Sequence, residues 1–131
     1  MISMYVVFQP EVLMYTFRIG VVGFYPEGAD NETLDRMLNE AFDQLERGRS
    51  AAFEIAVHTS GKVARRARAC ATARHWDVVT AVTLPGTNPV LIYDGMVRIG
   101  GGNTEQDQIA QFRRRFSELP QGHPRPIVER D

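Results

Sequence analysis

The sequence contains almost no cysteine and no apolar run long enough to cross a membrane. Cys70 is the single cysteine among 131 residues, which excludes an intrachain disulfide framework and a cysteine-rich metal site. A membrane-spanning helix needs about 20 consecutive apolar residues, and no stretch of this chain approaches that length. The formal net charge of −1 gives no reason to expect binding to nucleic acid or to a membrane surface. We therefore expect a cytoplasmic protein without either partner.

Residues 1–14 lack the pattern of a signal peptide. No basic segment precedes their apolar residues, and the polar stretch at 9–11 interrupts them. Two interpretations of this segment stay open. Either Met14 is an alternative start, or residues 1–16 add an edge strand to a sheet, at 4–8.

What the chain does contain is typical of one globular domain. Hydrophobic residues make up 44% and charged residues 24% of the sequence, as in ordinary folded domains, and the whole chain 1–131 is long enough to bury a core. His58, His75 and His123 are far apart and lack the spacing of metal ligands. We expect no metal ion and no other cofactor.

Short runs rich in valine and isoleucine alternate with helical patterns. Strands are expected at 17–23, 53–57, 78–84 and 96–99, helices after the first and second of these, a helical turn at 90–93 and a final helix at 104–119. The tail 120–131 is expected to be extended, with a short strand at Ile127 and Val128. Strands that are separated by helices form right-handed βαβ units. The sequence thus predicts an α/β fold, a Rossmann-like three-layer sandwich with a mainly parallel sheet.

The first two expected helices differ in the charge of their outer faces. Asp30 or Asn31 is expected to cap the first, which has an acidic outer face and ends at Gly48. Its apolar stripe consists of Leu34, Met37, Leu38, Ala41, Phe42 and Leu45. Thr59 or Ser60 is expected to cap the second, whose outer face is basic. The two faces are either solvated surfaces or surfaces that pair between copies of the chain, and the second interpretation predicts a homo-oligomer.

Three loops are expected to meet at one edge of the sheet. If the four strands take the order 3-2-1-4, the chain reverses direction across the sheet between the first and fourth strands, and parallel sheets bind ligands beside such a reversal. The loops there are 23–26, 58–61 and 100–104. In and beside the first two loops, the candidate ligand-binding residues are Gly23, Phe24, Tyr25, Ser60, Gly61 and Lys62. Tyr25 either stacks on a base or packs against the core.

The most informative of these loops is the glycine turn that joins the strand at 96–99 to the last helix. Gly100, Gly101 and Gly102 are followed by Asn103, which tolerates a left-handed backbone. A glycine turn between a strand and a helix exposes backbone N–H groups to an anion, and the helix N-terminus adds about half a positive charge. The pattern predicts phosphate binding; the alternative is a tight turn without a ligand.

Asp107, Glu105 and Arg98 are the candidate catalytic residues around this turn. Thr104 and Asp107 have the spacing of a capping box, in which each side chain bonds a backbone N–H of the other residue. Alternatively, the Thr104 hydroxyl binds phosphate, while Asp107 or Glu105 acts on a ribose as a carboxylate. Arg98 either points toward this site or lies at an edge of the sheet.

Three segments of the chain resemble the Rossmann-like superfamily called SLOG, which joins the Lonely Guy phosphoribohydrolases with the DNA-processing protein A group. Residues 18–24 are similar to its opening strand and glycine turn, and residues 60–67 to its second glycine loop and the helix behind it. Residues 99–107 are similar to its signature, Pro-Gly-Gly-any-Gly-Thr-any-any-Glu. Gly100, Gly101 and Thr104 match that signature, whereas Ile99, Asn103 and Asp107 depart from it.

This resemblance, over residues 17–118, implies binding of a nucleotide or a ribose phosphate. Its enzymatic form is a hydrolase of the N-glycosidic bond of nucleoside monophosphates. The arginine-bearing helix that precedes the signature in the phosphoribohydrolases has no clear counterpart before Asp94, so the resemblance supports binding more than hydrolysis. The alternative function is that of a non-catalytic protein that senses a nucleotide or assembles into oligomers.

Overall fold

The computed structural model describes residues 15–58, 60–80, 93–117 and 125–131. In chain order its elements are β2 (Thr16–Phe24), α2 (Asn31–Glu46), β3 (Ala52–Val57), α3 (Lys62–Ala73), β4 (Asp77–Thr80), β5 (Gly95–Gly100), α4 (Asn103–Ser117) and β6 (Ile127–Arg130). The predicted edge strand at 4–8, the strand residues 81–84 and the helical turn at 90–92 lie outside the described residues. None of the helices within the described ranges combines the length and hydropathy that a membrane crossing needs.

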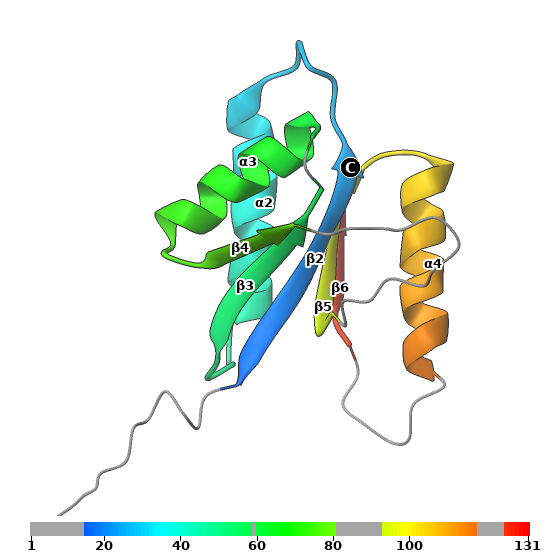
Figure 1. The fold of residues 1–131 in the computed structure, drawn as a ribbon. Helices are drawn as coiled ribbons and strands as arrows, with labels where there is room; N and C mark the ends of the chain where they lie inside the picture. The colour runs from blue at the N-terminus through cyan, green and yellow to red at the C-terminus, as the bar shows by residue number, and fades with distance from the viewer. Residues whose placement is uncertain (1–14, 59, 81–92, 118–124) are drawn as a thin grey trace, which may run out of the picture.

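One sheet of five parallel strands forms the middle layer, in the order β4-β3-β2-β5-β6. β2 lies at its centre and pairs with β3 on one side and with β5 on the other. Figure 1 shows α2 and α3 on one face of the sheet and α4 on the opposite face. The predicted α/β fold with a parallel sheet is therefore confirmed, and so is the order of the four predicted strands. The strand predicted in the tail is also present, as β6, which pairs in parallel with β5.

The central strands supply one side of the main core and α2 supplies the other. Ile19, Ile55 and Val97 are fully buried in this core, because alternate residues of a strand point to the same face. The apolar stripe predicted for α2 is buried with them at Leu34, Leu38, Ala41, Phe42 and Leu45. Each of the larger side chains contributes about 1.5–3 kcal/mol when it leaves water. This packing fixes the strands whose carboxyl ends carry the candidate loops.

The charged faces of α2 and α3 meet within the chain. Arg66 of α3 donates two hydrogen bonds to the Asp35 carboxylate of α2, from Nε at 2.8 Å and from Nη2 at 2.6 Å. Arg74 contacts Asp43 at 2.5 Å, and its guanidinium lies 5.1 Å from the centre of the Trp76 ring. These contacts already pair the opposite charges of the two faces. These contacts use part of the charge on which the predicted homo-oligomer was based, and the homo-oligomer stays a prediction.

Both predicted ends of α2 are confirmed. Asp30 is its N-cap and accepts hydrogen bonds from two backbone N–H groups of the first turn. The Thr33 hydroxyl also donates to the Asp30 carboxylate, at 2.7 Å, and is the main reason why the pKa of Asp30 is lowered. At the other end, Gly48 follows the helix with a left-handed backbone, φ 76°.

The start of α3 differs from the prediction. Gly61 is the N-cap in place of Ser60, and Thr59, the other predicted cap, lies outside the described residues. Gly61 has φ 105° and ψ 152°, a backbone conformation that is essentially restricted to glycine. This glycine turns the chain directly into the helix, so the helix begins one residue later than a serine cap would place it.

The end of α3 has a backbone conformation that favours glycine, yet residue 75 is histidine. The His75 N–H binds the Thr72 carbonyl and the Trp76 N–H binds the Ala71 carbonyl, which is the Schellman arrangement, and φ of His75 is 62°. We predict that His75→Gly raises the free energy of unfolding by about 0.5–1 kcal/mol, because a left-handed backbone strains a residue that has a Cβ. Chemical denaturation measures the change. His75→Ala is the control, since it retains the Cβ; an equal gain there would show that the backbone was not the cause.

Candidate functional site

The loops that follow β2, β3 and β5 meet at the carboxyl edge of the sheet. Lys62, at the start of α3, donates hydrogen bonds from Nζ to the backbone carbonyls of Pro26 at 3.0 Å and Glu27 at 3.1 Å, in the loop after β2. Phe24 at the end of β2 pairs with Gly100 at the end of β5. The three loops therefore adjoin the boundary between β2 and β5. The strand order reverses there, and parallel sheets bind ligands at such a boundary.

Lys62 makes its contacts within the protein. The residue is only 4% exposed, and a third hydrogen bond runs from Nζ to the Ala29 carbonyl. An ammonium group has three N–H donors, and the three loop carbonyls use all of them. Tyr25 is partly buried against the core, and its ring centre lies 5.4 Å from the same Nζ. Lys62 thus positions the loop after β2, and the structure favours the packing interpretation of Tyr25.

Gly23 and Gly100 are required by the close approach of β2 and β5. A Cβ on Gly23 would lie 2.2 Å from the carbonyl oxygen of Ile99, and a Cβ on Gly100 would lie 2.6 Å from that of Phe24. Both glycines also have a positive φ, 152° and 53° respectively, where side chains are disfavoured. These two glycines therefore have a structural cause and do not by themselves indicate a ligand.

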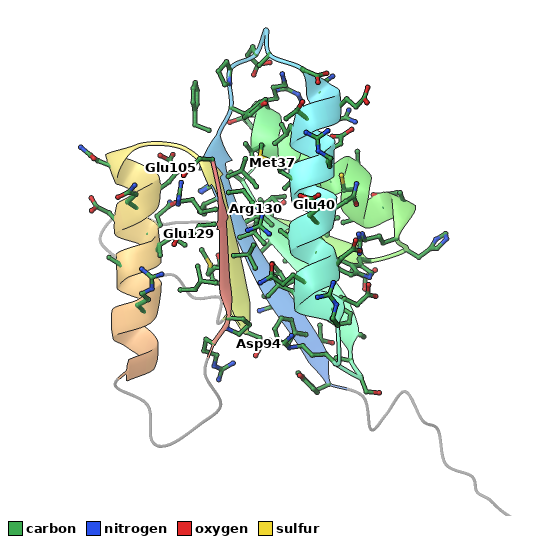
Figure 2. The ribbon with its side chains drawn as sticks, turned by 180° about the vertical axis from the view of Figure 1, so that it is seen from behind. Met37, Glu40, Asp94, Glu105, Glu129 and Arg130 are labelled. Carbon is green, nitrogen blue, oxygen red and sulfur yellow. The ribbon has the colours of Figure 1, made fainter. Side chains whose placement is uncertain are left out.

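Glu105 caps the first turn of α4. Its Oε1 accepts a hydrogen bond of 2.8 Å from the N–H of Gly102, and its Cγ would lie 2.8 Å from a Cβ added to Gly101. Figure 2 shows Glu105 at the start of α4, at the carboxyl edge of the sheet. The prediction that Thr104 and Asp107 form the capping box is wrong, because α4 begins earlier than that pairing requires. Glu105 is consequently the third helical residue, from which a carboxylate reaches back to the cap.

Arg98 binds both the glycine turn and the last strand. It is 7% exposed, and it donates from Nε to Glu129 at 2.9 Å and from Nη1 to Asp131 at 3.2 Å. Nη1 also donates to the Gly100 carbonyl. The hydrogen bond to the Glu129 carboxylate is the main cause of the raised pKa of Arg98, and Figure 2 shows Glu129 on the α4 side of β6.

The sequence prediction did not include Glu129 and Asp131 as partners of Arg98. Both acidic residues lie in the tail, which was expected to be extended with a short strand at Ile127 and Val128, and no contact with Arg98 was predicted for it. Glu129 and Asp131 are two residues apart, the first within β6 and the second just after it. Alternate strand residues share a face, so this spacing could have predicted that both contact the same cation. A charged residue inside the buried strand β5 needs such partners.

Most other predicted site residues are exposed at this edge: Phe24, Ser60, Gly61, Gly101, Gly102, Asn103 and Asp107. The Thr104 side chain lies outside what the structure describes.

α3 differs from its neighbours, because Asp30 caps α2 and Glu105 caps α4, whereas Gly61 has no side chain and the first turn of α3 contains no acidic residue. Among the described helices, α3 is thus the one whose N-terminus has no carboxylate cap.

Within the described ranges, no three His, Cys, Asp or Glu residues are grouped in a way that could hold a metal ion. Comparisons of the chain with protein-family models, with curated proteins and with solved structures found no match. The parallel α/β fold is Rossmann-like, and the resemblance to SLOG depends on the three sequence segments alone.

Proposed function

We propose that the carboxyl edge of the sheet binds a nucleotide or a ribose phosphate, as in a SLOG-like nucleotide-binding domain. The observation that supports this function is the start of α3 at Gly61, beside the boundary between β2 and β5. The cap offers no side-chain acceptor to the N–H groups of the first turn, and the helix dipole makes this end electropositive. An anionic phosphate is the ligand that such a helix end favours.

The start of α4 is assigned to the sugar rather than to the phosphate. The Glu105 carboxylate already accepts the N–H of Gly102, and a phosphate at the same place would meet a like charge. Carboxylates accept hydrogen bonds from ribose hydroxyls, and Glu105 is the carboxylate that faces the glycine turn. Asp107 is exposed two residues further along α4, and residues at that spacing do not share a helix face. We therefore assign the phosphate to the backbone at Ser60 and Gly61, and the ribose to Glu105.

We predict that Gly61→Ala weakens nucleotide binding about tenfold, which corresponds to about 1.4 kcal/mol. The reason is that an alanine Cβ is incompatible with φ 105°, so the first turn of α3 shifts. Calorimetric titration with adenosine monophosphate, guanosine monophosphate and ribose 5-phosphate measures the affinities.

Gly48→Ala is the matched control for this substitution. Gly48 also has a positive φ, and among the described atoms nothing lies within 4 Å of a Cβ added at either glycine. Gly48 follows α2 and precedes β3, at the amino edge of the sheet, so we expect Gly48→Ala to retain the wild-type affinity. Equal affinity of Gly61→Ala and the wild type would contradict the assignment of the phosphate to α3. If the wild type binds none of the three ligands, the proposed function is wrong.

The same samples distinguish binding from turnover. A phosphoribohydrolase would release free base from nucleoside monophosphates, with Arg98, Glu105 and Asp107 as its candidate catalytic residues. We propose binding without turnover, because the Arg98 guanidinium is buried and hydrogen-bonded to Glu129, Asp131 and the Gly100 carbonyl within the protein. Free base in the incubated samples would identify a hydrolase instead.

A further inference from the structure

We infer that Phe24 is the platform on which the base of the bound nucleotide stacks, a role that rests on the proposed function. Phe24 is the last residue of β2 and is 64% exposed, so a large apolar surface remains in water at the carboxyl edge. Aromatic side chains bind planar rings by offset stacking. Phe24 pairs with Gly100, which opens the glycine turn before α4, where the ribose is assigned. Such a ring therefore suits a ligand that carries a planar base on that ribose.

The strands on either side of β2 leave the Phe24 ring open. On one side Phe24 pairs with Gly100 of β5, which has no side chain to lie against the ring. On the other side, the last pair between β2 and β3 is Gly20 with Ala56. β3 ends at the next residue, Val57, and therefore does not extend as far along the sheet as Phe24. The ring therefore has no cross-strand side chain beside it on either neighbouring strand, and a planar ligand can lie against it.

The aromatic residues that directly follow and precede β2 are tyrosines, and neither fits this role. Tyr25, the residue for which base stacking was one prediction, packs against the core and has the Lys62 ammonium near its ring. Tyr15 is 55% exposed, but it precedes β2 at the amino edge, where its ring lies 6.5 Å from that of Phe17. Tyr15 and Phe24 are the exposed large hydrophobic side chains among the described residues, and Phe24 is the one at the carboxyl edge.

Ribose 5-phosphate and nucleoside monophosphates together test the stacking role. We expect Phe24→Ala to bind nucleoside monophosphates about ten- to a hundredfold more weakly than the wild type, because that is the typical effect of removing a base-stacking aromatic residue. Ribose 5-phosphate has no base, and we expect its affinity to stay unchanged. Phe24→Trp should retain nucleotide binding, since the indole offers a flat aromatic surface of at least the same size.

Tyr15→Ala is the matched control, because it removes an exposed aromatic ring next to the same strand at the opposite edge. We expect it to leave every affinity unchanged. An equal loss of nucleotide and ribose 5-phosphate binding in Phe24→Ala would overturn the stacking role and leave the proposed function intact, and so would an unchanged nucleotide affinity. If the wild type binds neither class of ligand, the proposed function fails and the stacking role fails with it.

Discussion

Lys62→Met is expected to lower the free energy of unfolding by about 2–3 kcal/mol. Methionine fills a similar volume, but it leaves the carbonyls of Pro26, Glu27 and Ala29 without the ammonium that joins them. Hydrogen bonds to a charged group contribute about 1.5–3 kcal/mol each, and water can replace part of this loss because Pro26 and Glu27 are exposed. Urea denaturation measures the change. Hydrogen exchange of the amides at residues 24–30 should become faster if the loop loses its attachment to α3.

Arg65→Met is the matched control for Lys62→Met. Arg65 lies in the same turn of α3 and also contacts the loop after β2, through an ion pair of 2.7 Å with Glu27. Its side chain is 54% exposed and that of Glu27 is 69% exposed, and such surface pairs contribute at most about 1 kcal/mol. We expect a small loss of stability and unchanged loop exchange. An equal loss of stability in the two variants would show that Lys62 contributes no more than an exposed ion pair does.

Arg98→Met is also expected to cost about 2–3 kcal/mol of stability. The substitution removes the cation that Glu129, Asp131 and the Gly100 carbonyl share. Breaking a fully buried ion pair costs about 3–5 kcal/mol, and the smaller value applies here because the Glu129 side chain is 36% exposed. Denaturation in urea gives the magnitude, and exchange of the β6 amides shows whether the loss begins at the edge strand.

Two further variants separate the buried pair from its surroundings. Arg113 also contacts Glu129, at 3.5 Å, but its side chain is 59% exposed, so we expect Arg113→Met to cost less than about 1 kcal/mol. The combination of Arg98→Met with Glu129→Leu should recover part of the stability, because the partly buried Glu129 carboxylate is then no longer left without its cation. Asp131 keeps its carboxylate, but its side chain is 88% exposed and stays in water. A double variant less stable than Arg98→Met alone would contradict this account of the pair.

The fold could be predicted because its signals are local in the sequence. Leu34, Leu38 and Leu45 recur at the period of a helix, and short β-branched runs such as that around Ile19 mark buried strands. Right-handed crossovers then left few orders in which parallel strands could pair. The same patterns identified neither the caps of α3 and α4 nor the charge partners of Arg98, which depend on single residues.

The candidate site could be predicted only in outline because its contacts join distant residues. Lys62 was predicted to contact a ligand from the start of a basic helix, and only the fold shows that it binds carbonyls 33 to 36 residues earlier. Arg98 likewise binds Glu129 from 31 residues away. The caps at Gly61 and Glu105 were missed because Ser60 and Thr104, next to them, are better cap formers by residue type alone.

The Glu105 contact also changes what affinity at the glycine turn would measure. The N–H of Gly102 is already bound to a carboxylate, so an anion arriving there would take part in an exchange of one acceptor for another. The measured binding free energy would be the difference between two states of the Gly102 N–H, one bonded to the anion and one bonded to Glu105. Glu105 would then be released beside the new ligand, where its negative charge would oppose the anion. The chain's own carboxylate is therefore a built-in competitor for any anion at this turn.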